Sequence, residues 1–189
     1  MKIRDSGMPE EQIWSNLFDT ELILTEMQIN SHIHHLVEVG CGYGTFTIPA
    51  SRRIGGHLYA FDIEKEMVET VHSKIEASGI ESIILEQRDL LKDGTGLPNN
   101  SIDYVMLFNL LHHDNPQELF TETHRVLTPG GKAGIIHWRS DIPTPRGPDL
   151  SIRPTLQRII NWVDKQMFTL HKNPVTLEPY HFGLILSKL

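Results

Sequence analysis

Three glycines spaced one residue apart form the most informative pattern in this sequence. An apolar segment, 36–39, carries Glu38 and leads directly into Gly40, Gly42 and Gly44. Glycine permits a sharp turn with positive φ, and its missing side chain lets a ligand approach the main chain. The N–H groups that open the following helix point toward such a ligand. Because Glu38 repels a pyrophosphate, the loop suits a ligand that carries positive charge or presents N–H groups.

The spacing of these glycines differs from the dinucleotide-binding fingerprint. That fingerprint, G-x-G-x-x-G, needs its third glycine at the position that Thr45 holds. A nucleotide-dependent oxidoreductase is therefore an alternative against which the spacing and Glu38 both argue.

Further polar residues follow the later apolar segments. Asp62 comes about 20 residues after the glycine loop, where a carboxylate can accept the hydroxyl hydrogens of a ribose; a helix N-cap is the alternative. Asp89 follows the apolar segment 82–86 and is either a ligand contact or a loop aspartate in water. His112 and His113 follow 102–108, and each is a candidate general base or a residue that caps or packs.

The elements that must position these residues alternate in type. The patterns predict strands over 36–39, 57–61, 82–86, 102–108 and 132–138. They predict helices over 45–54, 64–77, 115–127 and 154–168, and two closing strands over 175–177 and 181–188. Alternating strands and helices predict an α/β fold with a doubly wound parallel sheet. Ligands of such sheets bind at the carboxyl ends of the strands, which selects the residues above.

The order E-x-G-x-G-x-G resembles the first motif of the class I S-adenosylmethionine-dependent methyltransferases. The later motifs resemble those of small stand-alone members that share motifs with the quinone and sterol methyltransferases. The resemblance covers nearly the whole chain and implies a Rossmann-like, mostly parallel seven-stranded sheet with an antiparallel C-terminal strand. It also implies S-adenosylmethionine as cofactor and methyl transfer to a small molecule by in-line displacement.

The resemblance implies a role for each matching residue. Glu38 lies near the amino acid part of the cofactor, the glycine loop lies beneath its methionine and ribose, and Asp89 accepts the adenine amino group. The implied cofactor contacts are Glu38, Gly40, Gly42, Gly44, Asp62, Ile63, Asp89, Leu90 and Asn109. His112 and His113 are the candidate catalytic residues, and a base is needed only if the acceptor must lose a proton. A non-catalytic S-adenosylmethionine-binding partner or sensor is the other alternative, because cofactor motifs do not establish turnover.

Two further features allow weaker hypotheses. Arg139, Arg146 and Arg153 flank or lie in a proline-rich loop, where they could clamp an anion or simply face solvent. Trp14 and Phe18 could form an aromatic lid or pack on a helix face.

Size and composition limit the function classes. A length of 189 residues predicts one domain over 1–189, with an N-terminal helical segment 1–30 and a Rossmann-like core 31–189. The net charge of −7 and scattered basic residues argue against nucleic acid as a partner. No apolar run fits a membrane helix and one cysteine allows no internal disulfide, so we expect a cytoplasmic protein without a membrane partner. The histidines of 32–35 lack the converging ligands of a zinc site, so no metal is expected. Oligomeric state is left open.

Overall fold

The computed structural model describes residues 7–189, so the first six residues of the expected N-terminal segment lie outside the described part. The helices are α1 Glu11–Ser15, α2 Thr20–Glu26, α3 Thr47–Ser51, α4 Lys65–Ser78, α5 Leu90–Asp93, α6 Pro116–Val126 and α7 Leu156–Trp162, with a 3-10 turn at Leu150–Ile152. The strands are β1 His35–Val39, β2 His57–Asp62, β3 Ile83–Gln87, β4 Ile102–Phe108, β5 Leu127–Trp138, β6 Phe168–Leu170, β7 Val175–Leu177 and β8 His181–Lys188.

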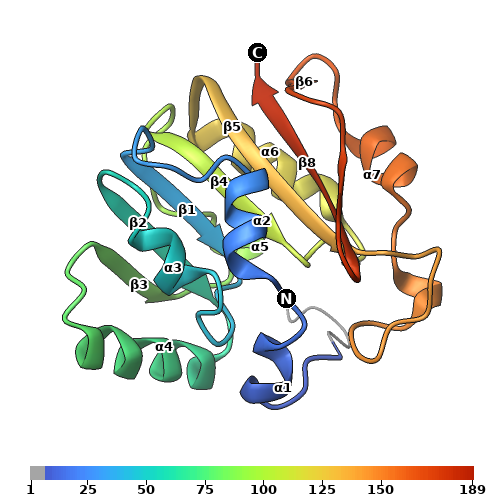
Figure 1. Ribbon diagram of the computed structural model, residues 1–189. Coiled ribbons are helices and arrows are strands. Elements are labelled where there is room, and N and C mark those ends of the chain that lie inside the picture. Colours follow the sequence, from blue (N-terminus) through green and yellow to red (C-terminus); the bar gives the residue numbers. More distant parts are fainter. Residues whose placement is uncertain (1–6) are drawn as a thin grey trace.

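One mixed sheet joins all of these strands (Figure 1). Its order is β3-β2-β1-β4-β5-β8-β6, and β7 pairs with β8 beside this path. Strands β1 to β5 are parallel, whereas β8 runs antiparallel to β5. The strand order reverses between β1 and β4, which is where open α/β sheets bind their ligands. The α/β class and the antiparallel C-terminal strand are confirmed.

Helices cover both faces of the sheet, and each face has its own apolar core. Along β4, Tyr104, Met106 and Phe108 join the core beneath α1 to α4. Val105 and Leu107 join the core beneath α6 and α7 on the opposite face. The strand is thus buried on both sides, which accounts for its near-continuous apolar sequence.

The C-terminal region differs from the prediction. The sheet has eight strands rather than seven, because Phe168 to Leu170 pair with β8 as the short strand β6. The expected helix 154–168 ends at Trp162 for the same reason. Its apolar spacing fits a helix locally, but Phe168 is buried in sheet pairing.

Two other elements depart from their expected bounds. Helix α3 covers only Thr47–Ser51 of the expected 45–54, and Pro49 within it lacks an N–H to donate. Strand β5 starts at Leu127, so it includes the Pro129-Gly130-Gly131 stretch that was expected to separate helix from strand. An irregularity in its pairing with β4, between Ile102 and Tyr104, accommodates the extra residues.

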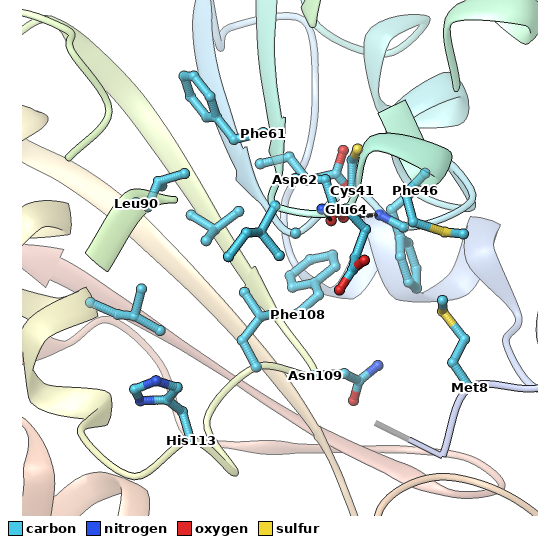
Figure 2. Close-up of a pocket in the computed structure, with 18 of the residues that line it drawn as sticks. Met8, Cys41, Phe46, Phe61, Asp62, Glu64, Leu90, Phe108, Asn109 and His113 are labelled. Carbon is cyan, nitrogen blue, oxygen red and sulfur yellow. Dashed lines mark hydrogen bonds between the residues drawn. The ribbon is translucent and has the colours of Figure 1, made fainter. Parts of the chain in front are cut away.

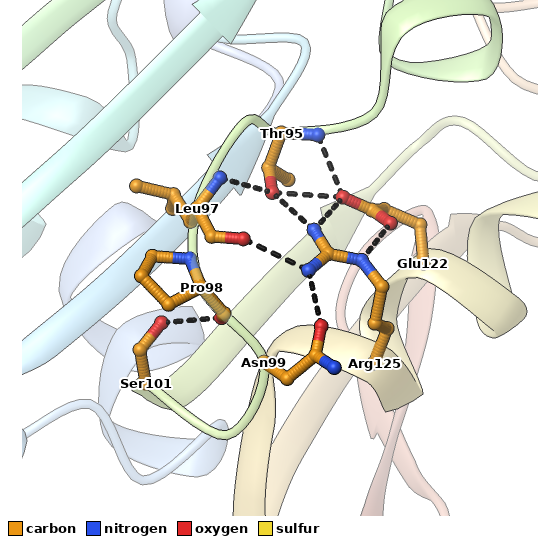
Figure 3. Close-up of polar contacts among 7 residues, drawn as sticks. All are labelled: Thr95, Leu97, Pro98, Asn99, Ser101, Glu122 and Arg125. Atoms are coloured by element: carbon orange, nitrogen blue, oxygen red, sulfur yellow. Dashed lines mark hydrogen bonds and ion pairs between the residues drawn. The ribbon is translucent and has the colours of Figure 1, made fainter.

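A polar cluster fixes the segment between α5 and β4 against α6 (Figure 3). Arg125 donates to the carboxylate of Glu122, to the carbonyl of Leu97 and to Asn99 Oδ1. Glu122 in turn accepts hydrogen bonds from the N–H and the hydroxyl of Thr95.

Across residues 7–189, no helix has both the length and the apolar character needed to cross a membrane.

Candidate active site

A cavity of about 400 Å³ opens at the carboxyl ends of β1, β2, β4 and β5 (Figure 2). Nearly all of the candidate residues line it. These are Glu38, Gly40, Gly42, Asp62, Ile63, Asp89, Leu90, Asn109, His112 and His113. Gly44 is the one candidate that does not line the cavity. The switch in strand order therefore brings together residues that are far apart in the sequence.

The three loop glycines all have positive φ, but each faces different surroundings. A Cβ on Gly40 would lie 2.8 Å from Leu110 Cδ2, and one on Gly44 would lie 3.1 Å from Val71 Cγ2 of α4. Within the part of the chain that the structure describes, a Cβ on Gly42 would meet only the sulfur of Met8, at 3.7 Å. Packing therefore explains the first and third glycines, whereas Gly42 is the position that a ligand can approach closely.

Asp62 links the glycine loop to the end of β2. Its Oδ2 accepts the Gly42 N–H at 2.8 Å, and its Oδ1 accepts the Glu64 N–H at 2.9 Å. The side chain is 8% exposed, and burial raises its pKa although both N–H groups oppose that effect. The N-cap of α4 is Glu64, so Asp62 supports the helix entrance without being the cap. Each carboxylate oxygen accepts more than one hydrogen bond, so Asp62 can also bind a ligand in the cavity.

Glu38 is a buried carboxyl group behind the glycine loop, and within residues 7–189 it forms no ion pair. It is 3% exposed, and Thr47 Oγ1 donates a hydrogen bond to its Oε2 at 2.5 Å. Burial raises the pKa of Glu38 to about 8; the Thr47 hydrogen bond opposes the rise and nearby Asp62 adds to it. A cationic ligand group would offset the cost of ionising Glu38.

Asp89 begins α5 instead of lying in a loop. Its Oδ1 accepts the N–H groups of Leu91 and Lys92, at 3.2 and 3.3 Å, which makes it the N-cap. The side chain is half-buried and lines the cavity beside Leu90. Capping and a ligand contact are compatible, because a carboxylate offers several acceptor positions.

Asn109 turns the chain away from the end of β4. It has φ 59°, a conformation that few residues other than glycine adopt. Its N–H donates to the Ile136 carbonyl at 2.9 Å, which anchors the turn. Its Oδ1 is buried and has no hydrogen-bond partner within the described residues. The strained turn places Leu110 over Gly40 and leaves a polar side chain at the cavity wall.

The two candidate histidines have different surroundings. His113 Nδ1 accepts the Asn115 N–H at 2.9 Å, just before α6. The His112 ring lies 5.6 Å from the ring of His137 on β5. Burial lowers the pKa of His137 to about 3, so that neighbour is uncharged at neutral pH. Both candidates line the cavity, and which of them is a base stays a prediction.

The anion-clamp hypothesis for the loop arginines has no support in the geometry. Arg153 is buried and donates to the carbonyls of Pro148, Arg139 and Arg146 and to the Thr144 hydroxyl. It holds its own loop together and lies over the Trp138 ring, 5.5 Å from the centroid. Arg139 pairs with Asp141. None of the three arginines is among the residues that line the cavity.

Of the two N-terminal aromatic residues, one lies where a lid over the site would lie and the other packs in the core. Trp14 lines the cavity, whereas Phe18 packs between Trp14, Phe46 and His181.

Cys41 also lines the cavity and is buried. Burial raises the pKa of its thiol, and Glu38 and Asp62 add to the effect. Its thiol therefore stays protonated and fills a small space in the turn.

Sequence reasoning missed several lining residues. They include Met8, Glu64, Arg88, Phe108, Leu110, Leu119 and Trp138. Phe108 and Trp138 could have been found, because each is the last residue of its strand. Met8 could not, because nothing in its surroundings in the sequence indicates that it reaches the glycine loop.

Comparisons with known proteins agree with this geometry. Residues 36–131 match a family described as a methyltransferase domain. The chain is 30% identical over 115 residues to the ubiquinone/menaquinone biosynthesis C-methyltransferase UbiE of Roseobacter denitrificans, covering 58% of this chain and 44% of that protein. It is 23% identical over 154 residues to the methyltransferase GfsG of Streptomyces halstedii, covering 80% and 50%. The chain thus spans about half the length of these curated relatives.

A solved structure supports the fold over most of the chain. A SAM dependent methyltransferase from Aquifex aeolicus superposes with a TM-score of 0.81 at 23% identity. The match covers 92% of this chain and 91% of that one.

Proposed function

The chain belongs to the methyltransferase domain family that it matches over residues 36–131, and we propose that it transfers the methyl group of S-adenosylmethionine to a small-molecule acceptor. One observation carries the proposal: Asp62 is hydrogen-bonded to Gly42 at the wall of a cavity that also contains the buried Glu38. We further propose that 1–189 forms one methyltransferase domain.

The residues at this end of the cavity fit the cofactor. Asp62 would accept the two ribose hydroxyls, since its oxygens keep free acceptor positions beside the Gly42 and Glu64 bonds. Gly42 would pass beneath the cofactor, because among the described residues only Met8 Sδ lies within 4 Å of a Cβ built there. Glu38 would attract the cationic amino acid end.

The adenine would lie between β2 and α5. Asp89 would accept its amino group, with Ile63 and Leu90 against the ring; all three line the cavity. Asn109 would complete the cofactor contacts through its buried Oδ1.

Bound S-adenosylmethionine supplies an electrophilic methyl group on sulfur. The chain would bind and orient the two reactants and exclude water. Phe46, Phe108 and Trp138 are buried at the cavity wall and would keep water away from the reacting atoms. A base is needed only for an acceptor that must lose a proton, and His112 and His113 are the two candidates for it.

The name of one relative favours a small acceptor. The relative from Roseobacter denitrificans is named as a C-methyltransferase of ubiquinone/menaquinone biosynthesis. We propose a small molecule and not nucleic acid for this chain, since its net charge is −7. A cytoplasmic location, expected from the composition, stays a prediction, and so does the absence of a membrane partner.

Thermal unfolding with separate ligands tests the proposal. S-adenosylmethionine and S-adenosylhomocysteine should each stabilise the protein, by about 2.7 kcal/mol at 100 times the dissociation constant. Asp62→Ala should weaken both effects. Stabilisation by NAD alone would instead favour an oxidoreductase, and no response to any of the three would overturn the cofactor assignment. Tight binding without methyl transfer to any of a broad acceptor panel would favour a binding protein.

A further inference from the structure

Charge is unevenly distributed around the cavity. All its charged lining residues lie between β1 and α5: Glu38, Asp62, Glu64, Glu66, Arg88 and Asp89. The lining residues from β4 onward, and the described ones before β1, include no Asp, Glu, Lys or Arg. We call the end of the cavity beyond Phe108 the acceptor end; within residues 7–189, no charged side chain lines it to balance the charge of a bound ion. Placing an unpaired ion there would cost several kcal/mol.

His113 supplies a hydrogen-bond donor at the acceptor end. A backbone N–H can only donate, so His113 Nδ1, which accepts the Asn115 N–H at 2.9 Å, carries no proton. The proton of the neutral ring is therefore on Nε2. That nitrogen is buried without a hydrogen-bond partner among the described residues, and the whole residue is 8% exposed. In Figure 2, His113 and Asn109 lie on the side of Phe108 away from Asp62.

Trp138 supplies a second buried N–H donor beside the cavity. It ends β5, lines the cavity and is fully buried, and its Nε1–H has no partner within residues 7–189. Buried N–H groups are almost always hydrogen-bonded in native proteins. Two unpaired N–H donors beside one cavity indicate a ligand whose oxygen atoms accept hydrogen bonds from them. Asn109 and His112 are the other polar lining residues from β4 onward, and the remaining ones, Phe108, Leu110 and Leu119, are apolar.

Building on the proposed methyl transfer, we propose that the acceptor is an uncharged, largely apolar molecule whose hydroxyl or carbonyl oxygen accepts a hydrogen bond from His113 Nε2–H. His113 then selects and positions the acceptor. It does not take a proton through Nε2, because that nitrogen already carries one while Nδ1 accepts the Asn115 N–H.

Four compounds on one ring system test the acceptor class: 2-naphthol, naphthalene, 2-naphthoate and 2-naphthylmethylammonium. Binding of each to the protein saturated with S-adenosylhomocysteine is measured by equilibrium dialysis at pH 7. We expect 2-naphthol to bind about fivefold more tightly than naphthalene, the worth of one hydrogen bond. We expect each ion to bind at least about tenfold more weakly than 2-naphthol, because desolvation is uncompensated.

Two substitutions at His113 test the donor. In His113→Asn the side-chain oxygen can replace Nδ1 as acceptor of the Asn115 N–H, but no donor remains at the Nε2 position. We expect this variant to bind 2-naphthol no more tightly than naphthalene and to bind S-adenosylhomocysteine normally. His113→Gln places an amide donor near the Nε2 position and should restore part of the preference. His72→Asn, at an exposed histidine of α4, is the matched control.

The outcomes separate the two proposals. If S-adenosylhomocysteine does not bind to the wild-type protein, the methyl transfer proposal fails. If it binds, but an ion binds as tightly as 2-naphthol or none of the four compounds binds, only the acceptor proposal fails. An unchanged preference for 2-naphthol in His113→Asn would also overturn the role of His113. The comparison of the four compounds uses the wild-type protein alone. It therefore tests the acceptor class even if His113→Asn does not fold.

Discussion

The N–H of Gly42 donates to Asp62 Oδ2 at 2.8 Å and thereby connects the loop after β1 to the end of β2. The other oxygen of the same carboxylate accepts the Glu64 N–H at the start of α4. One side chain thus organises two of the loops that form the cavity. Its function in binding and its function in folding are therefore coupled.

We expect Asp62→Asn to impair both functions. An amide has one oxygen, so one of the two N–H groups would face an NH₂ donor and lose its acceptor. A buried unsatisfied donor costs about 1–3 kcal/mol, which urea unfolding measures. Binding of S-adenosylhomocysteine should fall at least about tenfold by calorimetry, since a ribose contact is lost as well. Glu81→Gln, at an exposed residue before β3, is the control and should change neither the stability nor the affinity for S-adenosylhomocysteine. Unchanged affinity in Asp62→Asn would contradict the ribose assignment.

Glu38 gives the free protein a pH-dependent stability. Its folded-state pKa of about 8 lies above the usual value of 4.5, so the folded state binds more protons between these values. The contribution of Glu38 to stability is complete below pH 4.5 and is lost as the pH rises through 8. Glu38→Gln does not titrate, so we expect it to match the wild-type protein at pH 4.5 and to be more stable by on the order of 3 kcal/mol at pH 8.

Unfolding of both proteins at several pH values measures this difference. A gap that is constant with pH would mean that the substitution acts through the Thr47 hydrogen bond and not through ionisation. Lower stability of Glu38→Gln at pH 8 would contradict the prediction outright.

The glycines of the loop should respond differently to alanine. Both Gly40→Ala and Gly42→Ala force a residue with Cβ into positive φ, at a cost of about 1–2 kcal/mol. Gly40→Ala also brings Cβ to 2.8 Å from Leu110, so it should be the less stable variant. Gly42→Ala should fold, because its Cβ meets Met8 Sδ at an ordinary contact distance of 3.7 Å, but it should lose affinity for S-adenosylhomocysteine, because the Cβ would lie where the cofactor is proposed to pass.

A double-mutant cycle tests the packing explanation for Gly40. Adding Leu110→Ala should recover part of the stability that Gly40→Ala loses, and it should not help Gly42→Ala. Equal loss in both single variants, with no coupling to Leu110, would show that backbone strain alone explains the pattern.

The sequence predicted the strands and the cavity well because both depend on local signals. Buried strands such as β4 are apolar along their length, and the carboxyl ends of parallel strands meet at one edge. Asp62, Asp89 and Asn109 could therefore be assigned to one site without knowledge of any contact. The reason for each glycine could not be predicted, since Leu110 and Val71 reach the loop only through tertiary packing.

The C-terminal region was predicted less well for a related reason. Arg153 satisfies carbonyl groups of its own loop, and its sequence surroundings do not show which groups need a donor. Phe168 has helical spacing with its neighbours but pairs with Lys188 in the sheet. For Phe168, pairing with a distant strand overrides the local pattern. For Arg153, the folded shape of the loop decides which carbonyl groups its side chain reaches.

The cluster around Glu122 in Figure 3 should give the protein an acid-sensitive component of stability. Burial alone would raise the pKa of Glu122, but hydrogen bonds from Arg125 and Thr95 outweigh it and hold the pKa at about 2. The folded state therefore binds fewer protons than the unfolded chain between pH 4.5 and 2. The contribution is present above pH 4.5 and is lost as the pH falls toward 2. We expect Glu122→Gln to be less stable by about 1–3 kcal/mol at pH 7 and this deficit to shrink below pH 4.5.

Urea unfolding at pH 7, 5 and 3.5 distinguishes this explanation from a simple loss of packing. Glutamine has nearly the shape of glutamate, so a deficit that persists unchanged at pH 3.5 would mean that the charge on Glu122 is not its source. Glu76→Gln is the matched control, because Glu76 lies on α4 with its side chain 70% exposed beside His72. Exposed ion pairs contribute little, so this control should change stability by less than about 0.5 kcal/mol at every pH. Since Thr95 and Leu97 lie in the segment that connects α5 to β4, the acid-sensitive loss should loosen this segment first.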